Sequence, residues 1–228
     1  MPARVAQGGK RRETVCSGRG HVGTPLLCNH DFAVHKWPMR KKDEAKRHAI
    51  FEATVAEVVA GGLAGASIAS IARRAGVSQG TIYLYHADKD ALLRASLLEA
   101  KRRIHDALMR AAEGSDGPAS AIRAQWFALH AFVEEQPDVF LFAEHAMNAG
   151  LLRGSEPELA RMGEEMLAPI ESGLRDGTLR KAPPAAIASV LTAPAVQLAR
   201  RRAIGATLDQ ALIEATFDLA WKGVSTPS

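Results

Sequence analysis

Apolar residues recur at the spacing of an α-helix along most of this chain, and that period constrains the fold more than any other feature of the sequence. Ile50, Thr54, Val55 and Val58 share one face of a helix, while charged side chains lie mostly elsewhere. No segment shows sustained alternation of apolar and polar residues between turn signals, as a half-buried strand would. The sequence therefore predicts an all-α protein.

Glycines and polar stretches divide the periodic pattern into separate helices. Gly61 and Gly62 end the first helix, Gly76 suits a left-handed turn, and residues 113–118 are rich in turn-forming residues. We predict helices at 43–60, 67–75, from 78 onward, 89–112, 119–135, 138–147, 156–174, 185–204 and 208–221. A turn of about three residues separates the second from the third, which predicts a helix-turn-helix.

Composition and charge narrow the class of protein. Glu52 and Glu57 interrupt the longest apolar candidate, so no membrane span is predicted, and the N-terminus lacks the apolar stretch of an export signal. We therefore expect a cytoplasmic protein with no membrane partner. Residues 1–100 carry 15 basic and 9 acidic side chains (+6), whereas residues 101–228 carry 14 and 16 (−2). A site for a polyanion is expected in the N-terminal part.

Residues 1–38 are interpreted as a disordered leader rich in Gly, Arg and Pro, with Met39 as an alternative start of translation. A zinc interpretation would use Cys16, His21, Cys28, His30 and His35. Their spacing matches no close-paired ligand knuckle, so we predict neither a metal nor a cofactor.

The most specific pattern in the chain lies at residues 65–93. It consists of a small-residue cap, an isoleucine–alanine pair, a glycine-centred turn, a second glycine, a tyrosine, an aromatic pair and a lysine. These positions are Ser67, Ile71, Ala72, Ala75, Gly76, Val77, Ser78, Gly80, Tyr83, Tyr85, His86 and Lys89. With the preceding helix, residues 46–95 resemble the DNA-binding segment of the TetR family of repressors.

This resemblance implies a fold and a division of the chain. A three-helix DNA-binding domain is expected at 39–88, followed by a helical ligand-binding and dimerisation domain at 89–224. The family usually has phenylalanine where this chain has His86. That histidine either lies in the core as a neutral, hydrogen-bonded ring or contacts phosphate when it is charged.

The third helix is the expected reading element. Its first turn would enter a major groove about 12 Å wide, where Gln79 suits adenine edges and Thr81 a thymine methyl or a phosphate. Gly80 allows close backbone approach, and Ile82 is expected to face inward. The predicted DNA-binding set is Ser67, Ser78, Gln79, Gly80, Thr81, Tyr83, Tyr85, Lys89 and Lys46.

Within this set, Ser67, Tyr83, Tyr85 and Lys89 suit phosphate oxygens, which position a protein without reading sequence. Lys46 belongs to the basic cluster at residues 40–47. That cluster either lies close to the phosphates or forms an ordinary solvated face.

Residues 100–224 match no motif sharply, and the resemblance supplies most of what is expected there. It implies a chamber for an unidentified small-molecule effector and a homodimer formed through the last two long helices. The candidates for the chamber are Trp126, Phe127, His130, Phe140, Phe142, His145 and Met147, each of which could equally be plain core. The candidate dimer stripe is Leu208, Leu212, Ala215 and Leu219, which could instead seal the monomer's own core.

The function implied is that of a repressor released from a palindromic operator in double-stranded DNA when an effector binds. The effector would move the two DNA-binding heads so that they no longer match grooves about 34 Å apart. A helical protein-binding adaptor and an all-α enzyme are the alternatives. After Met39 the chain has no cysteine, no metal-spaced cluster and no glycine-rich strand-to-helix turn, so we predict no catalytic residues.

Overall fold

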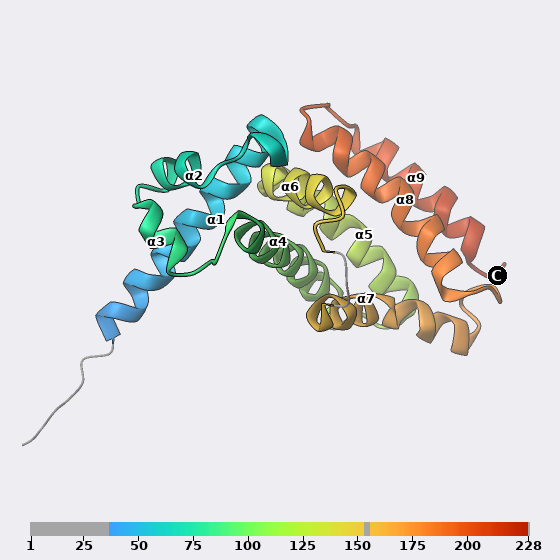
Figure 1. Ribbon diagram of the computed structural model, residues 1–228. Helices are drawn as coiled ribbons and strands as arrows, with labels where there is room; N and C mark the ends of the chain where they lie inside the picture. Colours follow the sequence, from blue (N-terminus) through green and yellow to red (C-terminus); the bar gives the residue numbers. More distant parts are fainter. Residues whose placement is uncertain (1–36, 153–155, 228) are drawn as a thin grey trace, which may run out of the picture. The chain divides into compact units, whose positions relative to one another are not determined.

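The computed structural model describes residues 37–152 and 156–227. In this part of the chain the regular structure is helical, with one isolated antiparallel bridge between Leu179 and Ser225. The helices are α1 (Trp37–Gly65), α2 (Ile68–Ala75), α3 (Gln79–Tyr83), α4 (Lys89–Ala112), α5 (Pro118–Glu135), α6 (Pro137–Asn148), α7 (Pro157–Asp176), α8 (Pro184–Ala203) and α9 (Gln210–Val224) (Figure 1). The all-α prediction is confirmed. The proposed zinc ligands, and all of the leader except Trp37 and Pro38, lie outside the described residues.

The first helix extends beyond the predicted 43–60 at both ends. Its backbone departs from helical geometry at Gly62, where φ is 70° and ψ is 173°. Glycine takes such a positive φ without the steric cost that a side chain adds. The predicted stop is therefore present as a break, after which the helical segment continues to Gly65.

Side-chain caps begin the next three helices, and the sequence pattern predicted those at Ser67 and Ser78 but not the one at Asp88. The Ser67 side chain accepts a hydrogen bond from the Ser70 backbone N–H at 3.0 Å. Ser78 and Asp88 do the same at the starts of α3 and α4, with donor–acceptor distances of 3.1 and 2.7 Å. Each cap satisfies an N–H group that has no partner within its own helix.

Proline begins each of the next four helices. Pro118, Pro137, Pro157 and Pro184 are the first residues of α5, α6, α7 and α8. The ring fixes a helical φ, and the missing N–H costs nothing in a first turn that lacks acceptors. These starts agree with the sequence-based predictions to within one residue.

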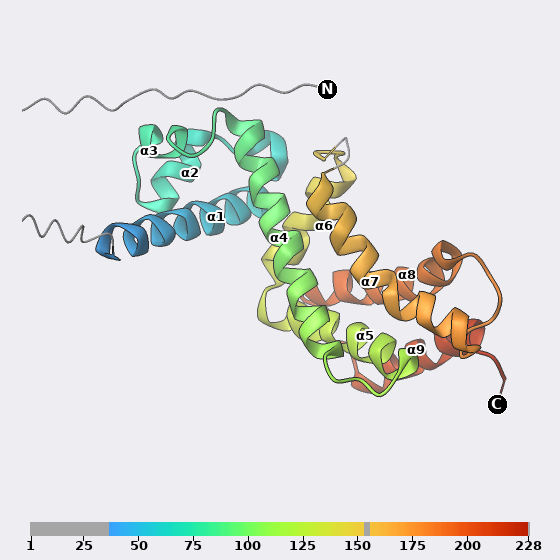
Figure 2. The same cartoon turned by 90° about the horizontal axis from the view of Figure 1, so that it is seen from below.

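Helix α4 connects the N-terminal helices to the remaining bundle. It packs against α1, and also against α5, α6 and α7, while α5 contacts α8 and α8 contacts α9 (Figures 1 and 2). The buried side chains on α1–α3 and those farther along the chain form one continuous core. The predicted division at residues 88 and 89 coincides with the start of α4, but it stays a prediction because α4 packs on both sides. No helix in the described ranges is long and apolar enough to span a bilayer.

Candidate functional site

A glycine and a serine shape the turn between α2 and α3. Gly76 adopts φ 67°, and the Val77 N–H donates to the Ala72 carbonyl at 3.0 Å. Ser78 then starts α3, with its Oγ 2.9 Å from Thr81 Oγ1. Because these contacts are local, the turn that the sequence predicted forms with little help from distant residues.

Helix α3 has one buried and one exposed face. Ile82 is fully buried, as predicted, and packs in the same core as Ile71 of α2. Gln79 and Gly80 are exposed, whereas Thr81 is half-buried. Tyr83 retains 53% of its surface. The three predicted base-reading residues therefore share the outward first turn of a helix that is anchored from beneath.

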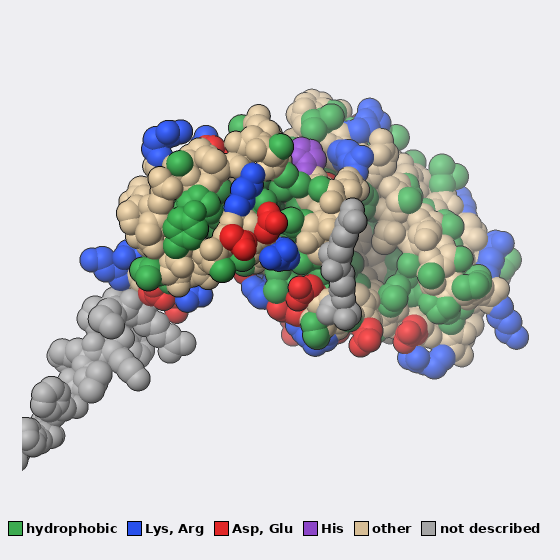
Figure 3. All heavy atoms as spheres, viewed as in Figure 1, with side chains coloured by type: hydrophobic (Ala, Val, Ile, Leu, Met, Phe, Trp, Pro, Cys, Tyr) green, Lys and Arg blue, Asp and Glu red, His purple; other side chains and the backbone are tan. Residues whose placement is uncertain are grey.

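Basic side chains surround this exposed turn. Lys46 on α1 is exposed, and Lys89 at the start of α4 is half-buried. Sequence reasoning did not single out Arg73 and Arg74, which are exposed at the end of α2; Arg74 pairs with Glu57 at 2.7 Å. Their adjacency inside the motif was the available signal. Lys and Arg side chains appear in blue over the α1–α3 end in Figure 3.

Tyr85 has a contact within the chain that the sequence did not predict. Its hydroxyl donates a hydrogen bond to Asp43 of α1, and the Arg47 guanidinium lies 4.7 Å above its ring. The hydrogen bond to Asp43 raises the pKa of the Tyr85 hydroxyl. Tyr85 thus ties the segment after α3 to α1, and a phosphate would have to compete with Asp43 for the hydroxyl proton.

His86 is half-buried against the ring of Tyr85, with the ring centroids 6.5 Å apart. Burial lowers its pKa, and the nearby charge of Arg47 lowers it further. Both effects favour the neutral imidazole. The neutral form agrees with the first of the two roles expected for His86, but the ring is half-buried rather than in the core and makes no hydrogen bond among the described residues.

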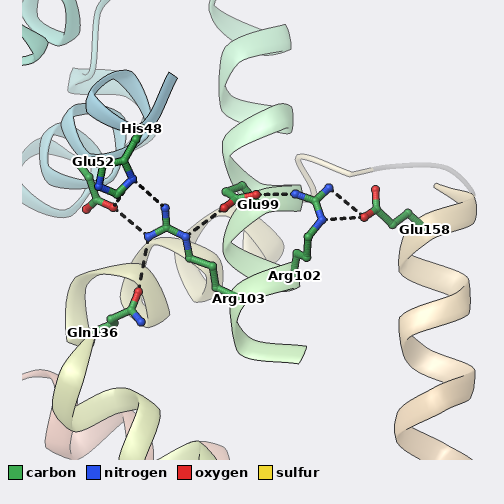
Figure 4. A network of polar contacts seen from close by, with 7 residues as sticks. All are labelled: His48, Glu52, Glu99, Arg102, Arg103, Gln136 and Glu158. Carbon is green, nitrogen blue, oxygen red and sulfur yellow. Dashed lines mark hydrogen bonds and ion pairs between the residues drawn. The ribbon is translucent and has the colours of Figure 1, made fainter. Parts of the chain in front are cut away.

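A polar network joins α1 to α4 and α7 (Figure 4). Arg103 of α4 contacts Glu52 of α1 at 2.8 Å and Glu99 of its own helix at 3.1 Å. Arg102 pairs with Glu158 of α7 at 2.8 Å and also with Glu99. Adjacent arginines on α4 therefore connect the helix-turn-helix to a helix of the C-terminal part.

A mainly apolar, partly open cavity of about 350 Å³ lies within the C-terminal bundle. Its walls come from α4, α5, α6, α7 and α8, and include Ile104, Trp126, Phe140, Met166 and Leu191. A larger depression of about 720 Å³ between α4, α5 and α7 is open to the surface. Small-molecule sites are usually concave and mostly apolar, so the smaller and more apolar cavity is the better candidate.

Two of the seven predicted chamber residues, Trp126 and Phe140, line this cavity. His130 and Phe142 are buried in the core outside it, and Phe127 packs against Phe217. His145 and Met147 are exposed. These five predicted residues do not line this cavity. Helical periodicity identifies buried faces, but it does not show which of them borders a void. The aliphatic walls from α7 and α8 carry no sequence signal that separates them from ordinary core.

Two charged side chains line the cavity, Lys101 of α4 and Glu144 of α6. Glu144 is paired with Arg200 of α8 at 2.5 Å. Lys101 has no ion pair or hydrogen bond among the residues that the structure describes. Burial lowers the pKa of the Lys101 ammonium, and Glu144 partly opposes the shift. Neither residue was singled out from the sequence as a chamber residue.

The outer face of α8 and α9 carries exposed apolar side chains. Leu219 retains 73% of its surface, Leu212 and Val190 are also exposed, and Ala215 lies among them on α9. Leu208, in contrast, is only 8% exposed and packs with Leu198 and Ile213. Three of the four predicted dimer residues therefore face outward, while Leu208 precedes α9 and turns into the chain's own core.

The structured part of the chain offers no obvious metal site. Among the described residues, no group of three or more His, Cys, Asp or Glu side chains is arranged to hold an ion. Glu144 and His145 are neighbours on α6, but their side chains point in different directions. Two short helices across a glycine turn, with the second helix exposed, followed by a bundle that contains a cavity, define the class of helix-turn-helix proteins with a helical regulatory part.

Comparisons with known proteins agree with this class. Residues 50–96 match the family described as bacterial regulatory proteins, tetR family. A transcriptional regulator, BetI, of Stenotrophomonas maltophilia is 33% identical over 88 residues, which are 38% of this chain and 45% of that protein. BetI of Burkholderia thailandensis is 37% identical over 82 residues, or 36% and 42% of the two chains. The match thus spans less than half the length of these curated relatives.

Similarity of structure extends farther along the chain. A TetR family transcription regulator from Marinobacter aquaeolei has a TM-score of 0.75 and is 27% identical, over 83% of this chain and 100% of that one. The DNA-binding segment at residues 50–96 is therefore that of the TetR family, and the fold of the chain as a whole matches a TetR family regulator. The named relatives of this chain are transcriptional regulators rather than enzymes.

Proposed function

We propose that this chain is a transcription regulator that binds an operator in double-stranded DNA as a homodimer and leaves it when a small-molecule effector binds. The observation that carries the proposal is the first turn of α3. It is exposed, carries Gln79, Gly80 and Thr81, and is anchored from beneath by fully buried Ile82. A short helix presented in this way suits the major groove.

Each part of the exposed turn has a chemical role on DNA. The Gln79 amide both donates and accepts, as an adenine edge requires. The space around Gly80 is open: a Cβ added there would meet only Ser78 Oγ within 4 Å, at 3.7 Å. Tyr83, Lys46 and the cap residue Ser67 are exposed around it and suit phosphate oxygens. Arg73 is added to this phosphate-facing set because it is exposed at the end of α2.

The homodimer is supported by the exposed face of Leu212, Ala215, Leu219 and Val190. Large apolar side chains gathered on one face are a common feature of protein–protein interfaces. Two copies meeting through α8 and α9 would form a four-helix contact with two-fold symmetry. That symmetry predicts a palindromic operator with half-sites about 34 Å apart.

Effector control is supported by the apolar cavity and by its connection to α1. Helix α4 lines the cavity and also carries Arg103, which pairs with Glu52 of α1. An effector that fits only one position of α4 would favour one position of the DNA-binding head. Repression is proposed because a regulator released by its effector blocks transcription while it is bound.

The test is a selection of random duplex DNA by the purified protein, read by sequencing. An enriched palindrome with half-sites one helical turn apart is expected. The double variant Gln79→Ala/Thr81→Val should lose the enrichment, while Glu171→Ala, at an exposed residue on α7, should retain it. Salt-insensitive binding or no binding to duplex DNA would instead favour a protein-binding adaptor.

A further inference from the structure

The wall of the cavity carries one positive and one negative side chain, and the negative one is paired outside the wall. Its apolar surface comes from residues such as Leu108, Leu129 and Ile170, while Lys101 and Glu144 are its charged members. The carboxylate of Glu144 is already neutralised by Arg200 at 2.5 Å. The ammonium of Lys101 makes no ion pair among the described residues, and Glu144 acts on it only from beyond ion-pair distance, so this cation has no direct counter-ion.

The same wall contains a second unpaired donor. Trp126 is 5% exposed, and its indole N–H has no hydrogen-bond acceptor in the described part of the chain. Leaving a buried donor or cation without a partner is unfavourable, because the water that solvated it has been removed. A ligand that carries hydrogen-bond acceptors is therefore favoured in the cavity.

We propose that the effector is an amphipathic anion, with a single carboxylate that pairs with Lys101 and an apolar body that fills the cavity. This inference rests on the proposed function, because it names the chemical class of the effector. The body contacts the aliphatic walls from α7 and α8, and the carboxylate takes the position next to α4.

Other ligand classes fit this wall less well. A neutral apolar molecule would fill the void but leave the Lys101 ammonium without a counter-ion. A cationic amphipath would be repelled by Lys101 and would find Glu144 already paired with Arg200. Burial lowers the pKa of Lys101. An anion placed beside it would favour its protonated form, so binding is expected to be accompanied by proton uptake at alkaline pH.

The experiment compares decanoate, decanol and decyltrimethylammonium by isothermal titration calorimetry on the full chain, below the concentrations at which each forms micelles. Decanoate is expected to bind about ten-fold more tightly than decanol, and the cation most weakly. Equal affinity for the acid and the alcohol, a preference for the cation, or no binding of any of the three overturns the proposal.

Variants of the lysine sharpen the result. Lys101→Met keeps the length of the side chain and should weaken decanoate about ten-fold while leaving decanol unchanged. Lys101→Arg should keep the preference for the acid. Lys181→Met, at an exposed lysine before α8, is the matched control and should bind decanoate as the parent does. Unchanged decanoate affinity in Lys101→Met overturns the role of Lys101. The comparison of the three ligands uses the parent chain, so it remains informative even if a variant fails to fold.

Failure of this inference is distinguishable from failure of the proposed function. A protein that selects a palindromic operator but does not prefer decanoate is a DNA-binding regulator with an effector of another class. A protein that prefers decanoate but selects no DNA contradicts the regulator and leaves an anion-binding helical protein.

Discussion

Arg103 Nη1 on α4 lies 2.8 Å from Glu52 Oε1 on α1, and the same guanidinium is centred 4.0 Å from the ring centroid of Phe51. Two residues earlier on α4, Lys101 lines the interior cavity. One helical turn of α4 therefore touches both the helix that supports the DNA-reading turn and the space proposed for the effector. Any displacement of this turn changes the contact between Arg103 and Glu52.

Replacing Arg103 should cost more than replacing an ordinary surface arginine. Arg103→Leu is expected to lower the free energy of unfolding by about 1–2 kcal/mol, because it removes a partly buried ion pair and a cation–π contact. A double-mutant cycle with Glu52→Gln should give a coupling energy of about 0.5–1 kcal/mol in urea denaturation. Arg161→Leu, whose pair with Glu165 is more exposed, should cost less than about 0.5 kcal/mol. Equal costs at the two arginines would contradict this account.

Gln79 and Lys46 should affect DNA binding in different ways. Gln79→Ala is expected to relax the preference at one base position, worth about 1–3 kcal/mol, because it removes a contact to a base edge. Lys46→Ala should weaken binding to all sequences alike and reduce the salt slope by about one unit, because it removes a phosphate contact. Fluorescence anisotropy on matched operators across a salt series measures both. A uniform loss in Gln79→Ala would assign that residue to phosphate instead.

The sequence alone predicted the exposed first turn of α3, because the features that form it are local. The cap at Ser78, the left-handed Gly76 and the inward Ile82 depend on interactions within a few residues, which a local pattern records. The contact of Tyr85 with Asp43 crosses 42 positions of the chain, and no local pattern indicates it. The predicted phosphate role of Tyr85 therefore has a competitor that only the structure reveals.

The exposed face of α8 and α9 should control association. Leu219→Glu is expected to convert a dimer into a monomer, because it places a charge at the centre of an apolar contact. Sedimentation equilibrium measures the mass directly. Leu84→Glu changes an even more exposed leucine, next to α3, and should leave the dimer intact. If Leu219→Glu also remains dimeric, the interface lies on another surface.

His130 should make the protein sensitive to acid. It is 4% exposed, both ring nitrogens lack partners among the described residues, and burial, followed by the charge of Arg202, lowers its pKa to about 4. The unfolded chain binds a proton near the ordinary value of 6.5, so stability is unaffected above that pH and falls as the pH drops from 6.5 towards 4. The loss between about pH 7.5 and about pH 5 should be roughly 2 kcal/mol.

The variant His130→Leu tests this prediction, because it cannot take up the proton. The difference in unfolding free energy between the two pH values should shrink by about that same 2 kcal/mol. His145→Leu, at an exposed histidine on α6, should leave the difference as it is. An unchanged difference in His130→Leu would mean that other groups cause the loss of stability in acid.

Two glycines of α7 should respond oppositely to alanine. A Cβ at Gly173 would lie 2.8 Å from Leu179 Cγ and Cδ1, and Leu179 is buried. Gly173→Ala is therefore expected to destabilise the fold by about 1–3 kcal/mol through overpacking. A Cβ at Gly163 meets nothing within 4 Å, so Gly163→Ala should stabilise the helix by roughly 0.5–1 kcal/mol. Thermal unfolding of the two variants distinguishes crowding from helix propensity, and stabilisation of both would contradict the close contact with Leu179.

Helix periodicity, caps and the glycine turn were sufficient to predict the all-α fold, the starts of α2 to α8 to within one residue, and the exposed first turn of α3. These features arise from interactions between residues near each other in the chain, so they appear directly in the sequence. The cavity, the unpaired Lys101 and the inward Leu208 depend on which faces meet across the bundle. Buried side chains at helical spacing satisfy the same pattern whether they fill a core or border a void. That distinction was therefore made only by the packing of α4 to α9 around one another.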